Sequence, residues 1–241
     1  MSAALLSTND LKAFYGDFQA LFGIDFEIGP GEVVALVGAN GAGKSTFLKS
    51  IMGVIQVARE MVCLDGQPTG GSPPHSMVAK GVSIVPEGRR LFTGMSVEDN
   101  LRVAIDHAAG GADTWSLGRV YDLFPILKEK RADLVQSLSG GQQQMVSIGR
   151  ALLNQPRVLL CDEISLGLAP KVINEIYEVI PSISQAGTAI VLVEQDVGLA
   201  KKASDRLYCI LEGKVMLTGK SADIPREDIS AAYFGAGHAV D

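Results

Sequence analysis

The chain has 241 residues, of which 27 are acidic and 21 are basic, and its formal net charge is −6. This length suits one sizeable domain, or a core domain with an inserted subdomain. The acidic balance argues against nucleic acid as the main partner, because binding a polyanion normally uses a basic face. With 47% hydrophobic and 20% charged residues, the composition is that of a globular protein, and disorder is expected only near the ends.

The sequence shows no targeting or membrane-spanning pattern. Its first residues lack a basic region followed by an apolar core, so they do not resemble a signal peptide. No apolar run approaches the roughly 18 residues of a membrane span. The three cysteines, Cys63, Cys161 and Cys209, lack metal-ligand spacing and are expected to be buried thiols in a reducing compartment. The sequence therefore predicts a soluble, cytoplasmic chain.

The predicted elements alternate between apolar strands and helices through the middle and end of the chain. Two N-terminal strands with a short connection are expected to form an antiparallel edge. In chain order, the prediction gives strands at 5–15, 20–29 and 32–37, a helix from 44 to about 53, a strand at 81–85, a helix from Ser96, a helix at 140–154, a strand at 157–163, a helix at 170–184, a strand from 189, a helix at 197–203 and a hairpin that turns at Glu212-Gly213.

This alternation predicts an α/β fold, a mostly parallel sheet with helices on both faces. Residues 88–150 contain few strand signals and are expected to form an inserted helical subdomain. Residues 1–87 and 151–241 would then supply the core and its antiparallel edge. The whole chain, residues 1–241, is predicted to be one domain.

The stretch "GANGAGKST" (Gly38–Thr46) fits the pattern G-x-x-x-x-G-K-[ST] between a strand and a helix. Its glycines let backbone N–H groups turn toward phosphate oxygens, and the helix N-terminus adds a favourable dipole. Lys44 would reach the β- and γ-phosphates, and Ser45 would bind Mg²⁺. The alternative is a glycine-rich turn without a ligand. The predicted nucleotide-binding residues here are Gly38, Asn40, Gly41, Ala42, Gly43, Lys44, Ser45 and Thr46.

The stretch "VLLCDE" (Val158–Glu163) is an apolar strand that ends in two carboxylates. Asp162 would hold the Mg²⁺ shell. Glu163 would act on the attacking water as a general base, an effect of about 10²–10⁴ in rate. Alone, this pair is a weak signal, because a solvated strand end looks the same. Behind a phosphate-binding loop it indicates an ATP-hydrolysing site.

The stretch "LSGGQ" (Leu138–Gln142) predicts a capped helix end, with Ser139 as the cap and Gln142 at the capping-box position. Gly140 and Gly141 leave the N-terminal amides uncovered, which makes a second anion site. An ordinary capped helix is the alternative. The order of the motifs argues against it, because Ser139 lies 23 residues before Asp162 and 95 after Lys44.

With these three motifs in this order, the chain resembles the ATP-binding cassette (ABC) ATPases, which have a P-loop NTPase fold. The resemblance implies ATP and Mg²⁺ as ligands, and an N-terminal antiparallel β subdomain beside the parallel core sheet. It also implies a head-to-tail sandwich dimer, in which the signature segment of one subunit closes over the ATP held by the other. Hydrolysis would then require a pair of subunits.

The resemblance also assigns roles to residues outside these motifs. Tyr15 stands where the family has an aromatic that stacks on adenine, although it could instead pack on the core as a strand-edge residue. The segment Ser165–Pro170 matches the loop that crosses the dimer interface, and Ile164 stands where the family usually has proline. Glu87 replaces the family's glutamine, and its carboxylate remains a suitable Mg²⁺ ligand.

Gln195 occupies the position of the family's switch histidine. A glutamine amide can donate to a phosphate oxygen but cannot take up a proton near neutral pH. We therefore expect Gln195 to sense the γ-phosphate by hydrogen bonding, and the predicted catalytic residues are Lys44, Glu163 and Gln195. The histidines of the chain, His75, His107 and His238, lie elsewhere and are expected at the surface.

The segments "VPEGRRLF", "LSGGQQQM", "DEISLGLAP" and "LVEQ" look like the LivF-type ATPases of branched-chain amino acid importers. This similarity extends from "LKAFYG" to "AAYFG". It implies a second ATPase subunit, two transmembrane permeases and an extracytoplasmic solute-binding protein as partners, with the chain at the cytoplasmic face of the plasma membrane. The helices after Glu87 would dock on a permease.

Three alternatives remain open at this point. The cargo could be urea, short amides or another solute, since urea-importer ATPases also carry "LVEQ" but usually keep glutamine in the first loop. A non-transport ABC ATPase acting on DNA or the ribosome is a second alternative, although such chains usually have a long coiled-coil insertion or two cassettes. A nucleotide-binding module without hydrolysis is the third.

Overall fold

The computed structural model describes residues 4–105 and 114–234. His75 is exposed, as expected, whereas His107 and His238 lie outside the described residues. None of the described helices combines the length and apolar character needed to cross a membrane. Cys161 and Cys209 are buried, as expected, but Cys63 is only partly buried. Burial raises the pKa of the Cys209 thiol to about 11.

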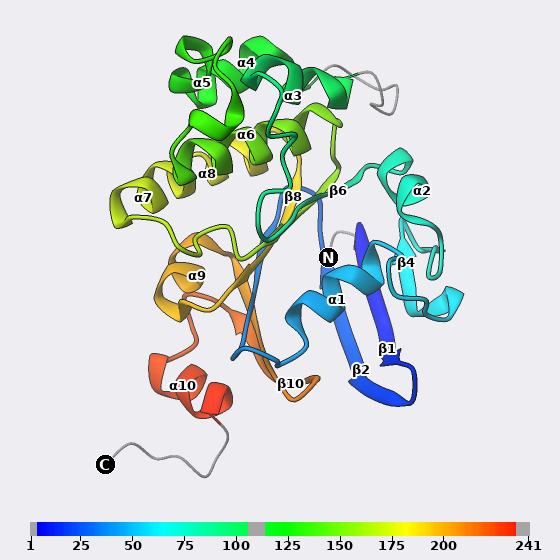
Figure 1. The fold of residues 1–241 in the computed structure, drawn as a ribbon. Coiled ribbons are helices and arrows are strands. Elements are labelled where there is room, and N and C mark those ends of the chain that lie inside the picture. Colours follow the sequence, from blue (N-terminus) through cyan, green and yellow to red (C-terminus); the bar gives the residue numbers. More distant parts are fainter. Residues whose placement is uncertain (1–3, 106–113, 235–241) are drawn as a thin grey trace.

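Two sheets form the framework of the molecule (Figure 1). The core sheet has the strand order β10-β9-β3-β8-β7-β6, and only β10 runs antiparallel to its neighbour. Its strands are β3 (Val33–Val37), β6 (Val82–Val85), β7 (Val158–Asp162), β8 (Ala189–Glu194), β9 (Arg206–Leu211) and β10 (Lys214–Lys220). The mostly parallel sheet predicted from the sequence is therefore present.

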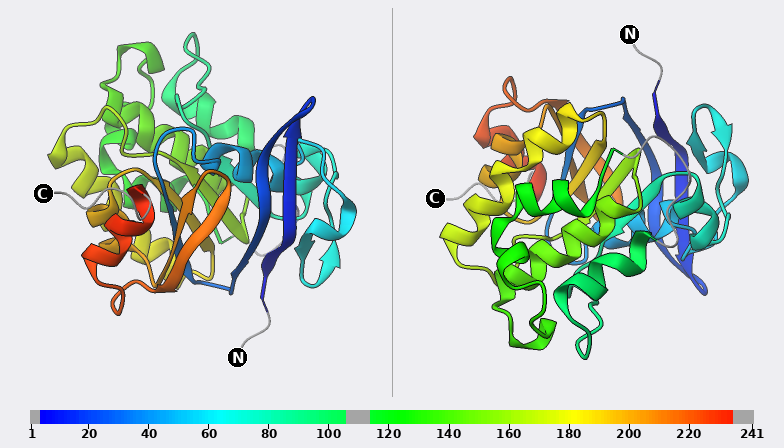
Figure 2. Two further views of the ribbon diagram at one scale, coloured as in Figure 1. Left: turned by 90° about the horizontal axis from the view of Figure 1, so that it is seen from below. Right: turned by 90° about the horizontal axis from the view of Figure 1, so that it is seen from above.

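The N-terminal strands pair antiparallel, as expected, but they belong to a separate sheet instead of an edge of the core sheet. The sequence reading also missed a strand of this second sheet, β4, which pairs with β1 on the side away from β2. The order is β2-β1-β4-β5, formed by β1 (Leu6–Tyr15), β2 (Phe18–Ile28), β4 (Val62–Leu64) and β5 (Gln67–Pro68). Figure 2 shows this sheet and the C-terminal helix on opposite sides of the molecule.

The helices occupy the faces of the core sheet and the region between β6 and β7. They are α1 (Lys44–Ile51), α2 (Pro74–Ala79), α3 (Val97–Ile105), α4 (Leu117–Leu123), α5 (Pro125–Glu129), α6 (Gly140–Leu153), α7 (Pro170–Glu178), α8 (Ile180–Gln185), α9 (Val197–Ala203) and α10 (Arg226–Phe234), with short 3-10 turns at Arg59–Met61 and Val135–Ser137. The expected boundary at residue 150 falls inside α6.

The single helix predicted over 170–184 is wrong in one detail, because it is divided into α7 and α8 at Val179. Pro181 has no backbone N–H and so cannot donate to the carbonyl one turn earlier. The α2 segment, the short strands β4 and β5, and the terminal helix α10 were not predicted. Their sequences are too short or too weakly periodic to be recognised without their packing partners.

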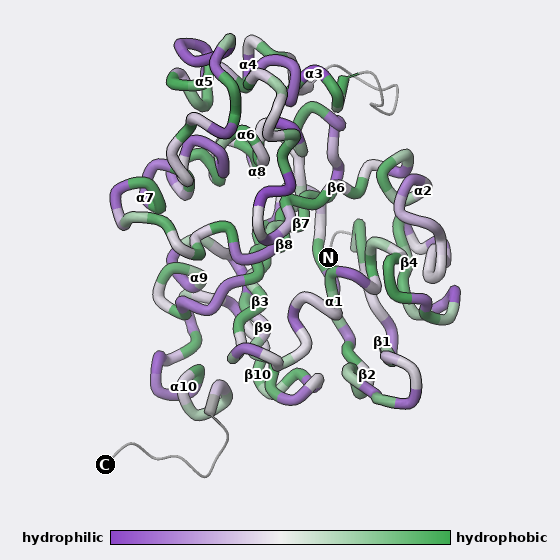
Figure 3. The backbone as a smooth tube through the Cα atoms, viewed as in Figure 1, coloured by the Kyte–Doolittle hydropathy of each residue, from purple (hydrophilic) through white to green (hydrophobic). Residues whose placement is uncertain are grey.

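The core-sheet strands alternate their side chains between two apolar layers. Leu160 of β7 and Val191 of β8 face α1 and the antiparallel sheet, whereas Leu159 and Leu192 face the helices between β6 and β7. Both faces are covered, so the central strands read as continuous apolar runs (Figure 3).

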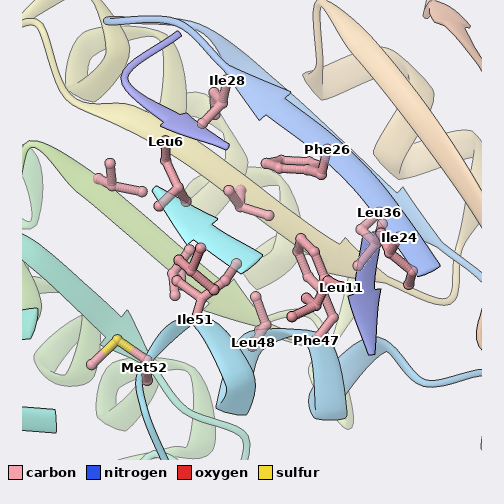
Figure 4. Packing of buried hydrophobic residues seen from close by; sticks show 14 of the residues in the cluster. Leu6, Leu11, Ile24, Phe26, Ile28, Leu36, Phe47, Leu48, Ile51 and Met52 are labelled. Carbon is pink, nitrogen blue, oxygen red and sulfur yellow. The ribbon is translucent and has the colours of Figure 1, made fainter. Parts of the chain in front are cut away.

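Helix α1 is packed between the two sheets. Phe47 and Leu48 are fully buried, and Phe47 lies beside Phe26 of β2 with ring centroids 5.1 Å apart. Figure 4 shows these side chains packed together with Leu11 of β1. Because its apolar face is fixed on both sides, α1 holds the loop that precedes it in a defined position.

We expect Phe47→Ala to destabilise the protein by about 3–5 kcal/mol, because it removes a fully buried aromatic ring between two sheets. Phe14→Ala is the matched control, since Phe14 is 49% exposed, and it should cost less than about 1 kcal/mol. Urea unfolding measures both changes. Equal destabilisation by the two substitutions would contradict this account of the α1 packing.

Candidate functional site

Three loops meet at the carboxyl ends of β3, β7 and β8. The strands are parallel neighbours in the order β3-β8-β7, so the segments that follow them leave at the same edge of the sheet. They carry Gly38–Thr46, Asp162-Glu163 and Glu194-Gln195, respectively. The sheet topology thus brings the phosphate-binding loop to two motifs that lie more than 100 residues after it in the sequence.

The phosphate-binding loop enters α1 through Gly43, which has φ 107°. A side chain is disfavoured in this backbone conformation, so glycine is the residue that fits. No side chain caps the N-terminus of α1 and its first turn holds no acidic residue. The amide groups at this helix end can therefore bind an anion.

The Lys44 ammonium is almost fully buried within this loop. Its Nζ donates to the carbonyl oxygens of Gly38 at 2.7 Å and Ala39 at 3.1 Å. The Glu163 Oε1 atom lies 3.3 Å from the same nitrogen. These contacts balance a buried charge and direct it toward the point where the three loops meet.

Ser45 and Asp162 lie side by side at the start of α1 and the end of β7. The Ser45 hydroxyl donates to Asp162 Oδ1 at 3.3 Å. Burial raises the pKa of Asp162, the hydrogen bond from Ser45 lowers it, and the negative charges of Glu163 and Glu87 raise it further. A bound cation would relieve this burial of negative charge.

The oxygen set of Ser45, Asp162 and Glu87 is of the type that Mg²⁺ prefers. No group of three histidine, cysteine or carboxylate side chains able to hold a metal exists among residues 4–105 and 114–234. Mg²⁺ is usually held by one or two carboxylates together with substrate phosphates. The oxygen atoms of Ser45, Asp162 and Glu87 fit such an ion.

Glu163 is held in a left-handed backbone conformation with φ 49°. Such a conformation is strained for a residue with a side chain, and it persists only where neighbouring contacts enforce it. Its N–H donates to the Val193 carbonyl at 2.9 Å, and its Oε2 accepts from Gln195 Nε2 at 2.6 Å. The end of β8 therefore fixes both the backbone and the carboxylate of Glu163.

A cavity of about 690 Å³ opens at this point. Of the predicted site residues, Tyr15, Asn40, Gly41, Gly43, Lys44, Ser45, Thr46, Glu87, Glu163 and Gln195 line it. Its size lies within the range of pockets for small molecules. The Tyr15 hydroxyl also lies 3.3 Å from the Thr46 hydroxyl, which ties the first strand to the phosphate-binding loop.

The cavity has aromatic lining residues that the sequence reading missed. Phe18 and Phe22 belong to β2, and both rings line this cavity. Phe18 is 70% exposed and Phe22 45% exposed, which is unusual for residues of this size. The run of aromatics in "FYGDFQALF" is the signal that could have indicated them.

The signature segment does not line this cavity. Ser139 caps α6, its hydroxyl accepts from the Gln142 N–H at 3.3 Å, and Gln142 Oε1 accepts from the Ser139 N–H at 3.0 Å. The predicted capping box is therefore confirmed. A Cβ atom on Gly141 would lie 2.2 Å from Cγ1 of Val172, so this glycine also permits close packing of α6 on α7.

Residues 21–165, more than half of the chain, match the ABC transporter family. The chain belongs to the ABC transporter family. The branched-chain amino acid transport ATP-binding protein BraG of Pseudomonas aeruginosa is 39% identical over 96% of this chain and 100% of its own length. The probable branched-chain amino acid transport ATP-binding protein LivF of Archaeoglobus fulgidus is 33% identical over 91% of this chain and 94% of its own length.

Solved structures of ABC cassettes agree with the fold. An ATP-binding subunit of an ABC transporter superposes with a TM-score of 0.77 over 92% of each chain, at 28% identity. The expected ABC-type P-loop fold is therefore confirmed, and the protein is an ATPase of this family.

We expect Asp162→Asn to stabilise the metal- and nucleotide-free protein at neutral pH, raising its melting temperature by on the order of a few degrees. The pKa of Asp162 is raised on folding. The contribution of Asp162 to the free energy of unfolding is complete below the ordinary carboxyl pKa. It is lost as the pH rises through the pKa of the folded state. The gain from asparagine should therefore appear near neutral pH and vanish in acid, as measured by thermal unfolding in EDTA.

Asp65→Asn is the control, and it should change the melting temperature in the opposite direction. Asp65 accepts two hydrogen bonds from Arg157, which hold its pKa below the usual range. Its contribution is present above the ordinary carboxyl pKa and is lost as the pH falls through the folded-state value. This substitution should lower the melting temperature slightly at neutral pH. If Asp162→Asn also lowered it, the account of Asp162 would be wrong.

Proposed function

We propose that this chain is the ATP-binding and ATP-hydrolysing subunit of an importer for branched-chain amino acids. The observation that carries the enzymatic part is the convergence of Lys44, Glu163 and Gln195 at one cavity mouth, with Asp162 and Ser45 beside them. The cargo rests on the names of the relatives BraG and LivF and on the likeness of "VPEGRRLF" and "LVEQ" to that branch.

In this proposal the phosphates of ATP bind the amides of the phosphate-binding loop, and Lys44 donates to the β- and γ-phosphates. The adenine stacks on Tyr15, whose side chain is 49% exposed at the cavity. Phe18 offers a second aromatic surface in the same cavity. Stacking on exposed rings is compatible with rapid binding and release of the nucleotide.

Ser45, Asp162 and Glu87 would hold Mg²⁺ together with the phosphates. When bound, the ion neutralises charge that develops on the phosphate oxygens. Asp162 is kept close to Ser45 by their hydrogen bond, so the two oxygens are already near each other. The negative charge near Asp162 favours cation binding at this place.

Glu163 would take a proton from the attacking water while the water oxygen bonds to the γ-phosphorus. In the same step, the bond between the γ-phosphorus and the β–γ bridging oxygen breaks. Gln195 holds the Oε2 atom of Glu163, which orients the carboxylate. As an amide, Gln195 would sense the γ-phosphate by hydrogen bonding without transferring a proton.

The second half of the site would come from another subunit. Ser139, Gly140, Gly141 and Gln142 lie away from the cavity of their own chain, which supports a role opposite the cavity of a partner. The partner would be a second ABC ATPase subunit. Two permeases docked on the helices between β6 and β7, and an extracytoplasmic solute-binding protein, would complete an assembly at the cytoplasmic face of the plasma membrane.

We expect Glu163→Gln to retain ATP binding and to reduce turnover in the assembled transporter by about 10²–10⁴-fold, because the general base is lost. Binding of a fluorescent ATP analogue and phosphate release measure the two effects. Glu60→Gln, an exposed carboxylate away from the cavity, is the control. Near-normal hydrolysis by Glu163→Gln would exclude the general-base assignment.

The same variant tests the cargo. In cells that lack this chain, the wild-type chain should restore uptake of radiolabelled leucine, whereas Glu163→Gln should not. If the wild-type chain restored uptake of urea but not of leucine, the cargo assignment would be wrong while the ATPase assignment stood.

We expect Ser139→Arg to block ATP-dependent pairing while leaving nucleotide binding by the separate chain within about twofold of wild type. A bulky cation at this exposed helix cap would obstruct a partner, whereas the cavity of the same chain does not include Ser139. Ser137→Arg, two residues earlier and also exposed, is the control. Analytical ultracentrifugation with ATP measures pairing. Normal pairing of Ser139→Arg would contradict the proposed role.

A further inference from the structure

Glu194 is a buried carboxylate that the proposed chemistry does not use. It is the last residue of β8, is 1% exposed and lies next to Gln195. Burying a carboxylate costs free energy unless several donors surround it. An apolar residue would commonly stabilise such a position as well or better. The presence of a charge here therefore requires an explanation other than packing.

Three donor groups surround Glu194, two from Ser165 in the loop after β7 and one from Tyr177 of α7. Its Oε2 accepts from the Ser165 hydroxyl at 2.6 Å, and its Oε1 accepts from the Ser165 N–H at 3.3 Å and from the Tyr177 hydroxyl. Burial raises the pKa of Glu194, and the hydrogen bonds from Ser165 and Tyr177 act in the opposite direction. Burial is the larger of these effects, so the pKa of Glu194 is raised overall, and the hydrogen bonds from Ser165 and Tyr177 hold the carboxylate in one orientation.

Residues 163–165 are each held in place by contacts with other parts of the chain, and Glu194 supplies the contacts that hold Ser165. The backbone and carboxylate of Glu163 are held by Val193 and Gln195. The next side chain, Ile164, is 2% exposed and packs in the apolar layer. Ser165 is then held by Glu194 through both its N–H and its hydroxyl. Because Glu163 has a left-handed backbone, these restraints determine where its carboxylate lies.

The third donor extends these contacts to the signature helix. Tyr177 belongs to α7, and Val172 on the same helix lies against Gly141 of α6. Helices in such close contact shift together more readily than apart. Glu194 therefore joins three parts of the chain, which are the segment that carries Glu163, the loop Ser165–Pro170 and the helix pair α6–α7.

We propose that Glu194 is a positioning residue for ATP hydrolysis, which holds the Glu163 carboxylate in its reactive place by fixing Ser165 and Tyr177. This inference rests on the proposed function of Glu163. Glu194 itself does not line the cavity, so it does not touch the nucleotide. Its removal should affect the chemical step more than the binding of ATP.

The test is steady-state ATP hydrolysis by the assembled transporter with Glu194→Gln, which keeps the shape of the side chain but removes its charge and one acceptor. We expect kcat to fall by on the order of 10- to 100-fold, as for a small misplacement of a catalytic group, with KM for ATP within about twofold of wild type. Ser165→Ala and Tyr177→Phe, each of which removes one donor, should lower kcat by smaller factors.

A double substitution separates positioning from general stability. Because Glu194→Gln and Ser165→Ala break the same contact, their combination should lower kcat no more than about twofold beyond Glu194→Gln alone. Tyr121→Phe is the matched control for Tyr177→Phe, since the Tyr121 hydroxyl also donates to a carboxylate, that of Glu98, but far along the chain from this site. It should leave kcat and KM unchanged.

Several results would overturn the proposal. They are a kcat for Glu194→Gln within about twofold of wild type, a raised KM with unchanged kcat, and full additivity of the two substitutions. If the wild-type complex and the Tyr121→Phe complex failed to hydrolyse ATP, the proposed function itself would fail, and the role of Glu194 with it. Normal hydrolysis by those two complexes with an unchanged Glu194→Gln would contradict only the role of Glu194.

Discussion

The pairing of the Lys44 ammonium with the Glu163 carboxylate is the interaction on which the organisation of the site depends. The two side chains are 4% and 10% exposed, and they come from the first residue of α1 and from the loop after β7. Where water is largely excluded, each charge needs the other, because removal of one leaves the second without compensation. A γ-phosphate that takes Lys44 as its partner would release one oxygen of Glu163, while Gln195 retains the other.

The described helices between β6 and β7 share one apolar core with the core sheet. Leu101 of α3, Val120 of α4 and Val146 of α6 belong to the same buried cluster as Leu159 and Leu192 of the core sheet. A force applied to these helices from outside is therefore transmitted through side-chain packing to the strands that carry Glu163 and Gln195. This continuity suits the proposed docking of a permease on these helices, which would link its movement to hydrolysis.

The sequence predicted those parts of the site that depend on short, contiguous segments. The phosphate-binding loop, the carboxylates after β7 and the capping box of Ser139 each lie within a few residues, and the parallel order of the strands then brings the first two of them to one edge. The role of β4 was missed because three residues carry no periodicity, and their pairing with β1 bridges more than 50 positions. The division of α7 from α8 was missed although Pro181 was visible in the sequence.

The surroundings of Glu194 could not have been predicted for a different reason. A glutamate at the end of an apolar strand reads as a solvated strand end, and its donors Ser165 and Tyr177 lie 29 and 17 residues away. Neither donor has a residue type that indicates a partner. Only the packing of α7 against the end of β8 shows that the carboxylate is enclosed.

The contact between Gly141 and Val172 has a consequence for how such sequences can diverge. A methyl group at position 141 would collide with the valine on α7, so a side chain at the first position becomes tolerable only after a smaller residue has appeared at the second. The order of the two substitutions is therefore constrained, because a chain with a side chain at position 141 and valine at position 172 would pack badly. A glycine that looks like a requirement of ligand binding is thus also retained by its neighbour, and the two positions are expected to change together across lineages.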